Sequence, residues 1–281
     1  MDWVFFFGRF HVLVLHLPIG IILAVIALEV ASRSRTLQHP ESAGSFLWAA
    51  AAVTSIVTVA LGYMHYFEGG FAGTSATVHM IAGTSVAVLA TLAWQLRKWL
   101  TSLYSRAQYG ISALLVILLV VAGHYGGNLT HGPDFLAEYA PGPIRALAGL
   151  EPRRPPVTEL AAADPWLDLV RPMLRARCSS CHNSERRRGM LDLSTYETTL
   201  AGGDTGPAIS PGNAEGSELY YRITLASDHE DYMPAEGKTP LTDIETEIIR
   251  WWIDAGAPAE TILANVDTAS VGPLLRNQLG L

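Results

Sequence analysis

Four long apolar runs fill the first half of this 281-residue chain and limit its possible folds more than any other feature. They span roughly Phe10–Ala31, Ser45–Phe67, Ala76–Leu96 and Tyr109–Gly127, and crossing a bilayer takes about 20 residues. In lipid a backbone must satisfy its own N–H and C=O groups, so apolar runs of this length form helices. The sequence therefore predicts a domain of four transmembrane helices over residues 1–131.

Basic residues predict the direction in which these helices cross the membrane. Arg33 and Arg35 follow the first run, and Arg97 and Lys98 follow the third, whereas residues 68–75 contain no Lys or Arg. Positively charged loops stay in the cytoplasm. The N-terminus and everything after the fourth run are therefore expected on the periplasmic side of a bacterial inner membrane. A cleaved signal peptide is the alternative for the first run, but the start Met-Asp-Trp-Val lacks a basic n-region and no small-residue cleavage site follows.

The second half contains the stretch Cys178-Ser-Ser-Cys181-His182, whose C-x-x-C-H spacing is typical of c-type haem attachment. Each thiol can form a thioether to the porphyrin, and His182 then serves as an axial iron ligand. Half of a zinc site is the alternative. Structural zinc takes four Cys or His ligands, but the chain has two cysteines and only His229 lies further along. The sequence predicts one covalent haem c, which bacteria attach outside the cytoplasm, in agreement with the predicted orientation.

A haem c iron also needs a sixth ligand, and three methionines follow the membrane helices. Met173 precedes the motif on the same predicted helix, and Met190 follows His182 too closely to cross to the other face. Met233 lies in a loop that Pro234 stiffens, so we expect Met233 to ligate the iron. Core filling is the other use of a methionine here, and His229 is the rival ligand, which would lower the potential.

The remaining sequence of the second half predicts a small helical domain. Residues 132–163 read as a Pro/Ala-rich linker, 164–260 as the cytochrome domain, and 261–281 as a tail. Asp164 is expected to cap a helix that leads to Cys178. A capping box of Thr242 and Glu245 is expected to start the last helix. The predicted fold class is all-α, and a net charge of −7 without a basic stripe argues against nucleic-acid binding.

Histidines in the membrane half are the second functional signal: His11, His16, His65, His79 and His124. An imidazole in hydrocarbon is costly and marks a functional candidate, and the predicted orientation puts all five near the outer side. We expect His16, His65, His79 and His124 to ligate haem b iron, with His11 as a fifth candidate that could serve a second haem. Copper or zinc and purely structural, hydrogen-bonded histidines remain alternatives. Neighbouring glycines leave room for a macrocycle or for close helix packing.

Two resemblances add to this interpretation. The motifs from Phe10-His11 to Pro18 and from Gly123-His124 to Gly132 resemble a four-helix bacterial membrane domain of unknown function, which is often fused to cytochrome c domains. This resemblance covers about residues 8–135 and implies haem-linked redox chemistry in the membrane.

The stretch from Pro165 to Pro258 resembles the planctomycete-type cytochrome c domain. This resemblance implies a class I-like helical fold with His–Met ligation. One departure occurs after Met233-Pro234, where Ala235-Glu236 replaces a repeated proline, and it leaves the methionine assignment intact. The other motifs that carry the resemblance are Cys178–Asn183, Arg188–Leu193, Gly202–Pro207, Ser210–Gly212 and Trp252–Ala257.

These features predict a membrane-bound electron-transfer cytochrome that passes electrons between haem b and haem c. Because no catalytic centre is visible, we expect it to be a subunit of a larger respiratory or dehydrogenase complex rather than a self-contained enzyme. A quinol-oxidising module is one alternative, with Glu29, Glu68 or Asp134 as proton acceptors. A cytochrome with a purely structural membrane anchor is the other.

Overall fold

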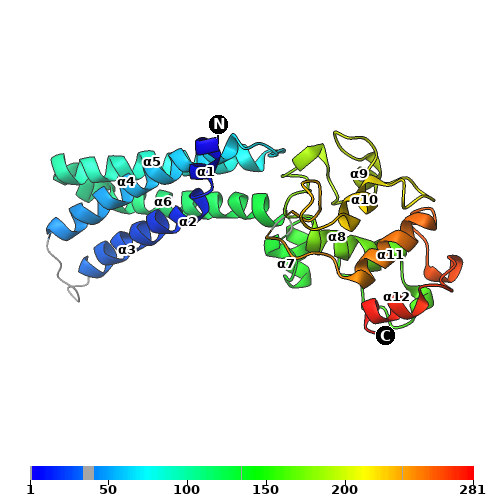
Figure 1. Ribbon diagram of the computed structural model, residues 1–281. Helices are drawn as coiled ribbons and strands as arrows, with labels where there is room; N and C mark the ends of the chain where they lie inside the picture. Colours follow the sequence, from blue (N-terminus) through cyan, green and yellow to red (C-terminus); the bar gives the residue numbers. More distant parts are fainter. Residues whose placement is uncertain (1, 34–40, 134, 236) are drawn as a thin grey trace. The chain divides into compact units, whose positions relative to one another are not determined.

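The computed structural model describes residues 2–33, 41–133, 135–235 and 237–281, and its regular elements are helices (Figure 1). Arg35, Asp134 and Glu236, which entered the predictions above, lie outside the described residues. The chain divides into two compact units, Met1–Asn128 and Leu129–Leu281. The predicted all-α class is confirmed.

The first unit contains four segments long and apolar enough to cross a membrane. The first of them, Asp2–Ser32, is broken into α1 (Asp2–Gly8), α2 (His11–Val14) and α3 (His16–Arg33). The other three correspond to α4 (Glu41–Tyr66), α5 (Ser75–Trp99) and α6 (Thr101–His131).

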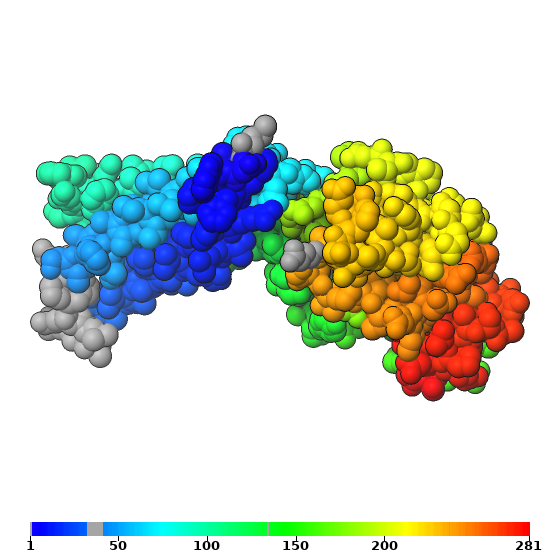
Figure 2. Space-filling view, viewed as in Figure 1, coloured from blue at the N-terminus to red at the C-terminus, as the bar shows by residue number. Residues whose placement is uncertain are grey.

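Two local features accompany the breaks in the first span. Pro18 has no N–H and cannot bond the carbonyl of Val14, which favours the interruption at Leu15. Gly8 lies directly on the backbone of α4, and a Cβ built at Gly8 would come within 2.6 Å of the His65 nitrogen. A residue without a side chain is therefore required where α1 meets α4. α1 itself lies on the surface of the unit (Figure 2).

The interior of the four-helix unit is closed by small side chains. Ala51, Ala90 and Ala93 are buried beside Trp48 and Leu115, and α4 packs against both α3 and α5. Small residues let helix backbones approach closely, which is how membrane helices associate without a strong hydrophobic driving force.

All four spans meet in one buried polar network at the end of the unit that holds the α5–α6 turn. Glu29 Oε1 of α3 accepts hydrogen bonds from Trp48 Nε1 of α4 at 3.0 Å, Arg97 of α5 at 2.8 Å and Tyr104 Oη of α6 at 2.6 Å. Gly44 makes room for the arginine, since a Cβ there would lie 2.4 Å from the guanidinium. The histidines occupy the opposite helix ends.

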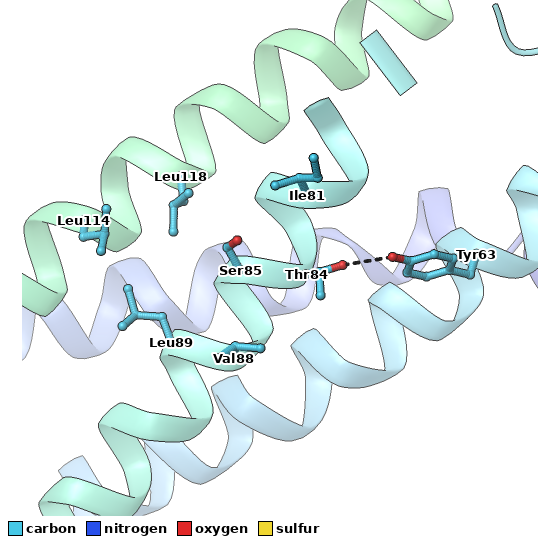
Figure 3. A pocket seen from close by; sticks show the side chains of 8 residues that line it. All are labelled: Tyr63, Ile81, Thr84, Ser85, Val88, Leu89, Leu114 and Leu118. Atoms are coloured by element: carbon cyan, nitrogen blue, oxygen red, sulfur yellow. Dashed lines mark hydrogen bonds between the residues drawn. The ribbon is translucent and has the colours of Figure 1, made fainter. Parts of the chain in front are cut away.

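Between α5 and α6 the unit has an open apolar groove of about 440 Å³, here called the α5–α6 groove (Figure 3). Figure 3 shows Leu114 and Leu118 of α6 facing α5, and the Tyr63 hydroxyl 3.4 Å from Thr84 Oγ1. The groove is lined by Tyr63, Ile81, Thr84, Ser85, Val88, Leu89, Leu114 and Leu118.

The second unit is a set of short helices around one core. Its elements are η1 (Phe135–Ala137), α7 (Gly142–Leu147), η2 (Leu160–Ala162), η3 (Pro165–Val170), α8 (Arg171–Arg177), η4 (Arg188–Met190), α9 (Tyr196–Ala201), α10 (Glu218–Thr224), α11 (Asp243–Asp254), η5 (Leu263–Asn265) and α12 (Gly272–Leu279).

Aromatic residues form the centre of this core. The rings of Trp166 and Trp252 stack with centroids 5.6 Å apart, and Tyr196 packs edge-on against both. The indole of Trp252 donates to the Pro258 carbonyl at 2.9 Å, so its polar atom is satisfied. Ala163 and Leu275, from the predicted linker and tail, also lie in this core. The packed unit therefore extends beyond residues 164–260 on both sides.

Both predicted helix starts are present. Asp164 Oδ1 accepts from the Trp166 and Leu167 nitrogens at 2.9 and 2.8 Å. Thr242 and Glu245 form both bonds of the capping box at the start of α11. These local signals position η3 and α8, which lead to Cys178, and α11, which packs across η3.

Candidate haem sites

The C-x-x-C-H stretch forms one helical turn directly after α8. The Cys178 carbonyl accepts hydrogen bonds from the nitrogens of Cys181 and His182, both at 3.1 Å. Residues at positions i, i+3 and i+4 of a helical turn lie on the same face. The turn therefore presents two thiols and one imidazole together, and both cysteines are free rather than disulfide-bonded.

The surroundings of His182 favour the neutral form of its imidazole, which is the form that binds a metal. Its Nδ1 is buried, and the backbone of Arg188 and Leu191 lies beside the ring. Burial lowers the pKa of His182 below its ordinary value, against the opposing effect of the Arg188 and Leu191 backbone. A lowered pKa keeps the ring neutral at neutral pH, and neutral imidazole is the form that binds a metal. Burial also raises the pKa of Cys178 to about 12, so its thiol stays protonated.

Side chains that the sequence reasoning missed hold this turn in place. The amide of buried Asn183 donates to the Ser179 carbonyl at 2.6 Å, and its oxygen accepts from the Glu185 and Arg186 nitrogens. An asparagine after C-x-x-C-H gives no distinct signal for this role.

A second contact joins the turn to α11. The sequence predicts α11 as the last helix, but α12 follows it in the core. Arg177 Nη2 lies 3.1 Å from each carboxylate oxygen of Glu245, which also belongs to the capping box of α11. The two residues are 68 positions apart, and no local pattern in the sequence predicts that they meet.

The candidate sixth ligands differ in their surroundings. Met173 is buried in the core and Met190 is 62 % exposed. His229 is exposed, and its Nδ1 accepts a hydrogen bond from the Asp231 nitrogen. Met233 is half-buried, and its nitrogen donates to the Arg222 carbonyl at 3.0 Å.

Comparison with known proteins bears on this site. Residues 178–237 match the model of a family described as planctomycete cytochrome C. The chain contains a planctomycete cytochrome c domain. The match begins at the first cysteine of the attachment motif and extends beyond Met233, so it includes the attachment residues and the predicted sixth ligand. No curated protein and no solved structure matches the chain.

The residues of this cytochrome c domain fit a covalent haem. Two free thiols and a buried, neutral imidazole on the same face of one turn form the expected donor set. The zinc alternative would need further ligands, and no group of three or more His, Cys, Asp or Glu suited to a metal ion occurs among the described residues. Cys178 and Cys181 would carry the thioethers, and His182 would bind the iron, which supplies one-electron redox chemistry.

In the first unit, Met1–Asn128, here called the membrane unit, the structure brings some histidines together and separates others. The ring centroids of His11 and His79 are 6.0 Å apart, and their planes are nearly perpendicular, at 89°. His65 follows Gly62 along α4, and its Nδ1 is 3.2 Å from Glu68 Oε2.

His16 and His124 lie elsewhere on the unit, and both are exposed. His16 begins α3, after the break at Leu15 that separates it from His11 in α2. His124 lies two residues from both Ala122 and Gly126, which contact His79, and two residues turn a helix by about 200°. Neither side chain belongs to the His11–His79 pair.

Proposed function

We propose that the protein is a membrane-bound electron-transfer cytochrome, in which a covalent haem c exchanges electrons with a haem b held by the four-helix unit. The observation that carries the proposal is the presence, in one chain, of a planctomycete cytochrome c domain and four helices long and apolar enough to cross a membrane. The helix α6 runs from the first unit into the second, which supports a protein in which both units act together.

His182 and Met233 are the proposed axial ligands of the haem c iron. Met233 lies at the end of a loop that Arg222 holds from α10, through a 2.9 Å bond to Asp231 and through its own carbonyl. His229 is the weaker candidate because its Nδ1 already accepts a backbone hydrogen bond. A thioether ligand raises the reduction potential relative to a second histidine.

The proposed location is a bacterial inner membrane, with the N-terminus and the cytochrome c domain on the periplasmic side. Arg97 and Lys98 end α5, whereas the connection from α4 to α5 contains no basic residue, which fits the positive-inside rule. The electron donor and acceptor are proposed to be other redox subunits of a larger complex.

The haem content of the full-length protein tests this function. In mild detergent, pyridine haemochrome spectra should give one covalent haem c and at least one extractable haem b per chain. Replacing both Cys178 and Cys181 with Ala should abolish haem staining on a denaturing gel while haem b remains. Undiminished staining of the double variant would refute the haem c assignment, and a wild-type protein with haem c alone would favour the anchor interpretation.

Quinol oxidation is the second candidate function, and the α5–α6 groove favours it. The groove is apolar and open, and it carries the hydroxyls of Tyr63, Thr84 and Ser85. An isoprenoid quinol has the same combination of an apolar tail and a polar ring.

Filling the groove tests quinol oxidation. Ile81→Trp should slow the quinol-dependent reduction of haem c, whereas Val57→Trp, at an exposed position of α4, should not. Equal rates in wild type and both variants would exclude the groove as the quinol site.

A further inference from the structure

We infer that His11 and His79 are the two axial ligands of a single haem b in the membrane unit. This inference rests on the proposed haem b and adds the ligand pair, which sequence reasoning could not choose among five histidines. It is carried by the spacing of the two rings, by the hydrogen bonds that orient them and by the glycines on which they lie.

The two rings have the separation that one iron atom requires. A metal–nitrogen bond to imidazole is about 2 Å, and the ring centroid lies roughly 1 Å behind the nitrogen, so opposed axial imidazoles have centroids about 6 Å apart. The observed separation is 6.0 Å, with the planes at 89°.

Each ring is oriented so that its Nε2 is available to bind a metal. His11 Nδ1 is 2.9 Å from the Thr58 carbonyl, and His79 Nδ1 is 2.8 Å from the Ala122 carbonyl. A carbonyl accepts only from a protonated nitrogen, so Nε2 of each ring keeps its lone pair. Histidine ligands of metals characteristically donate their second N–H in this way, which fixes the tautomer and the ring direction. No hydrogen bond at either Nε2 is found within the described ranges.

The His11 and His79 rings have the same kind of contacts with a neighbouring helix. His11 from α2 lies against Gly62 of α4, four residues after Thr58, and His79 from α5 lies against Gly126 of α6, four residues after Ala122. A Cβ at either glycine would come within 3.0 Å of the ring atoms. In each case the neighbouring helix, α4 or α6, provides a carbonyl that bonds Nδ1 and, one turn later, a glycine against which the imidazole packs.

The number of ligands favours haem over a bare metal ion. Copper or zinc requires three or four protein ligands, and no such group of His, Cys, Asp or Glu is found in the described part of the chain. A porphyrin supplies four nitrogens, so two histidines complete the coordination. The Arg9–Glu68 ion pair of 3.1 Å holds the segment before His11 at the end of α4, which positions the first ligand.

Single substitutions in the full-length protein test the pair, with the covalent haem c of the same chain as the internal standard. His11→Ala and His79→Ala should each abolish the low-spin haem b spectrum, and added imidazole should restore it. The matched controls His16→Ala and His124→Ala should keep the haem b to haem c ratio of wild type. Haem b that persists in both first variants, or that is lost in a control, would contradict the pair.

Failure of the inference is distinguishable from failure of the proposed function. A wild-type protein with haem c but no haem b contradicts the proposed function itself. Haem b that is present but ligated by other histidines contradicts only the pair. If the alanine variants lose both haems, His11→Met and His79→Met test whether these residues ligate haem b. Each should retain haem b with a raised midpoint potential, and an unchanged potential in both would refute the ligation.

Two independent readouts sharpen the test. Ferric haem with perpendicular axial imidazoles gives a strongly anisotropic low-spin EPR signal, whereas parallel rings give a rhombic one, so a rhombic haem b signal would contradict this geometry. Gly126→Ala should displace the His79 ring and shift the haem b potential, whereas Gly123→Ala, one turn away with open space at its Cβ, should not. Equal haem b potentials in both glycine variants would contradict the proposed role of the contact between Gly126 and the His79 ring.

Discussion

At the scale of single residues, the proposed potential of haem c depends on the loop that carries Met233. Arg222 of α10 binds Glu218 on its own helix at 2.7 Å and Asp231 in the loop at 2.9 Å, and its carbonyl accepts from the Met233 nitrogen. The loop is therefore attached to α10 at its base. A thioether is a weak ligand, and a fixed loop reduces the conformational entropy lost when it binds iron.

Met233→Ala should leave haem c covalently attached but change its iron. The long-wavelength sulfur-to-iron charge-transfer band should disappear, and the midpoint potential should fall, because methionine ligation raises it. Optical redox titration of the full-length protein measures both. Met190→Ala, at an exposed position, is the control and should change neither. If the band survives in Met233→Ala and is altered in His229→Ala, the methionine assignment is wrong.

The membrane histidines illustrate which residue properties the sequence could predict. Helix boundaries and charge pattern give the depth of a side chain, so all five histidines could be assigned to one end of the bundle. They do not give the direction in which a side chain points around its helix. His11 turns toward α4 because Gly62 leaves space there, 51 positions away in the sequence, and such a pairing is visible only when the helices are packed.

At the scale of elements, helix starts were predictable and the partners of helix ends were not. The caps at Asp164 and Thr242 depend on residues two or three positions away, so the local sequence contains the whole signal. Glu245 also binds Arg177, immediately before the attachment turn, and this contact depends on how α8 and α11 pack. The same carboxylate thus stabilises the start of α11 and the approach to Cys178.

Glu245 substitutions should separate these two roles. Glu245→Gln keeps an acceptor for the Thr242 nitrogen but loses the ion pair, and we expect a loss of about 1 kcal/mol in the free energy of unfolding. Glu245→Ala loses both contacts and should cost about 2 kcal/mol. Denaturant titration of the full-length protein, followed by the haem c Soret band, measures the difference.

The control for Glu245 is the exposed capping box of α9. Thr195→Ala should cost about 1 kcal/mol through the loss of a cap alone. If Glu245→Gln is as stable as wild type and Glu245→Ala costs no more than Thr195→Ala, the contact with Arg177 contributes nothing to stability.

At the scale of the whole molecule, the two ends of the membrane unit have different chemistry. The end with His11 and His79 contains the proposed cofactor ligands. The other end contains the Glu29 network, which joins α3, α4, α5 and α6 through one carboxylate oxygen. A charged group among membrane helices is costly unless it is paired, and this one is paired with Arg97 and bonded by two further donors. These contacts give the Glu29 end a role in assembly of the bundle, whereas redox chemistry is proposed for the histidine end.

Removing one partner of the Glu29–Arg97 pair should destabilise the bundle without emptying the haem site. Glu29→Leu leaves the Arg97 guanidinium buried without its 2.8 Å carboxylate partner, and breaking a buried pair typically costs about 3 kcal/mol or more. Glu29→Leu combined with Arg97→Leu should recover much of that loss, because no uncompensated charge remains.

Thermal unfolding in detergent measures stability, and the haem b to haem c ratio at low temperature should stay at the wild-type value in all variants. Arg106→Leu, at an exposed position near the same end, is the control and should be neutral. A double variant no more stable than Glu29→Leu, or a single variant that lacks haem b while still folded, would contradict this division between the two ends.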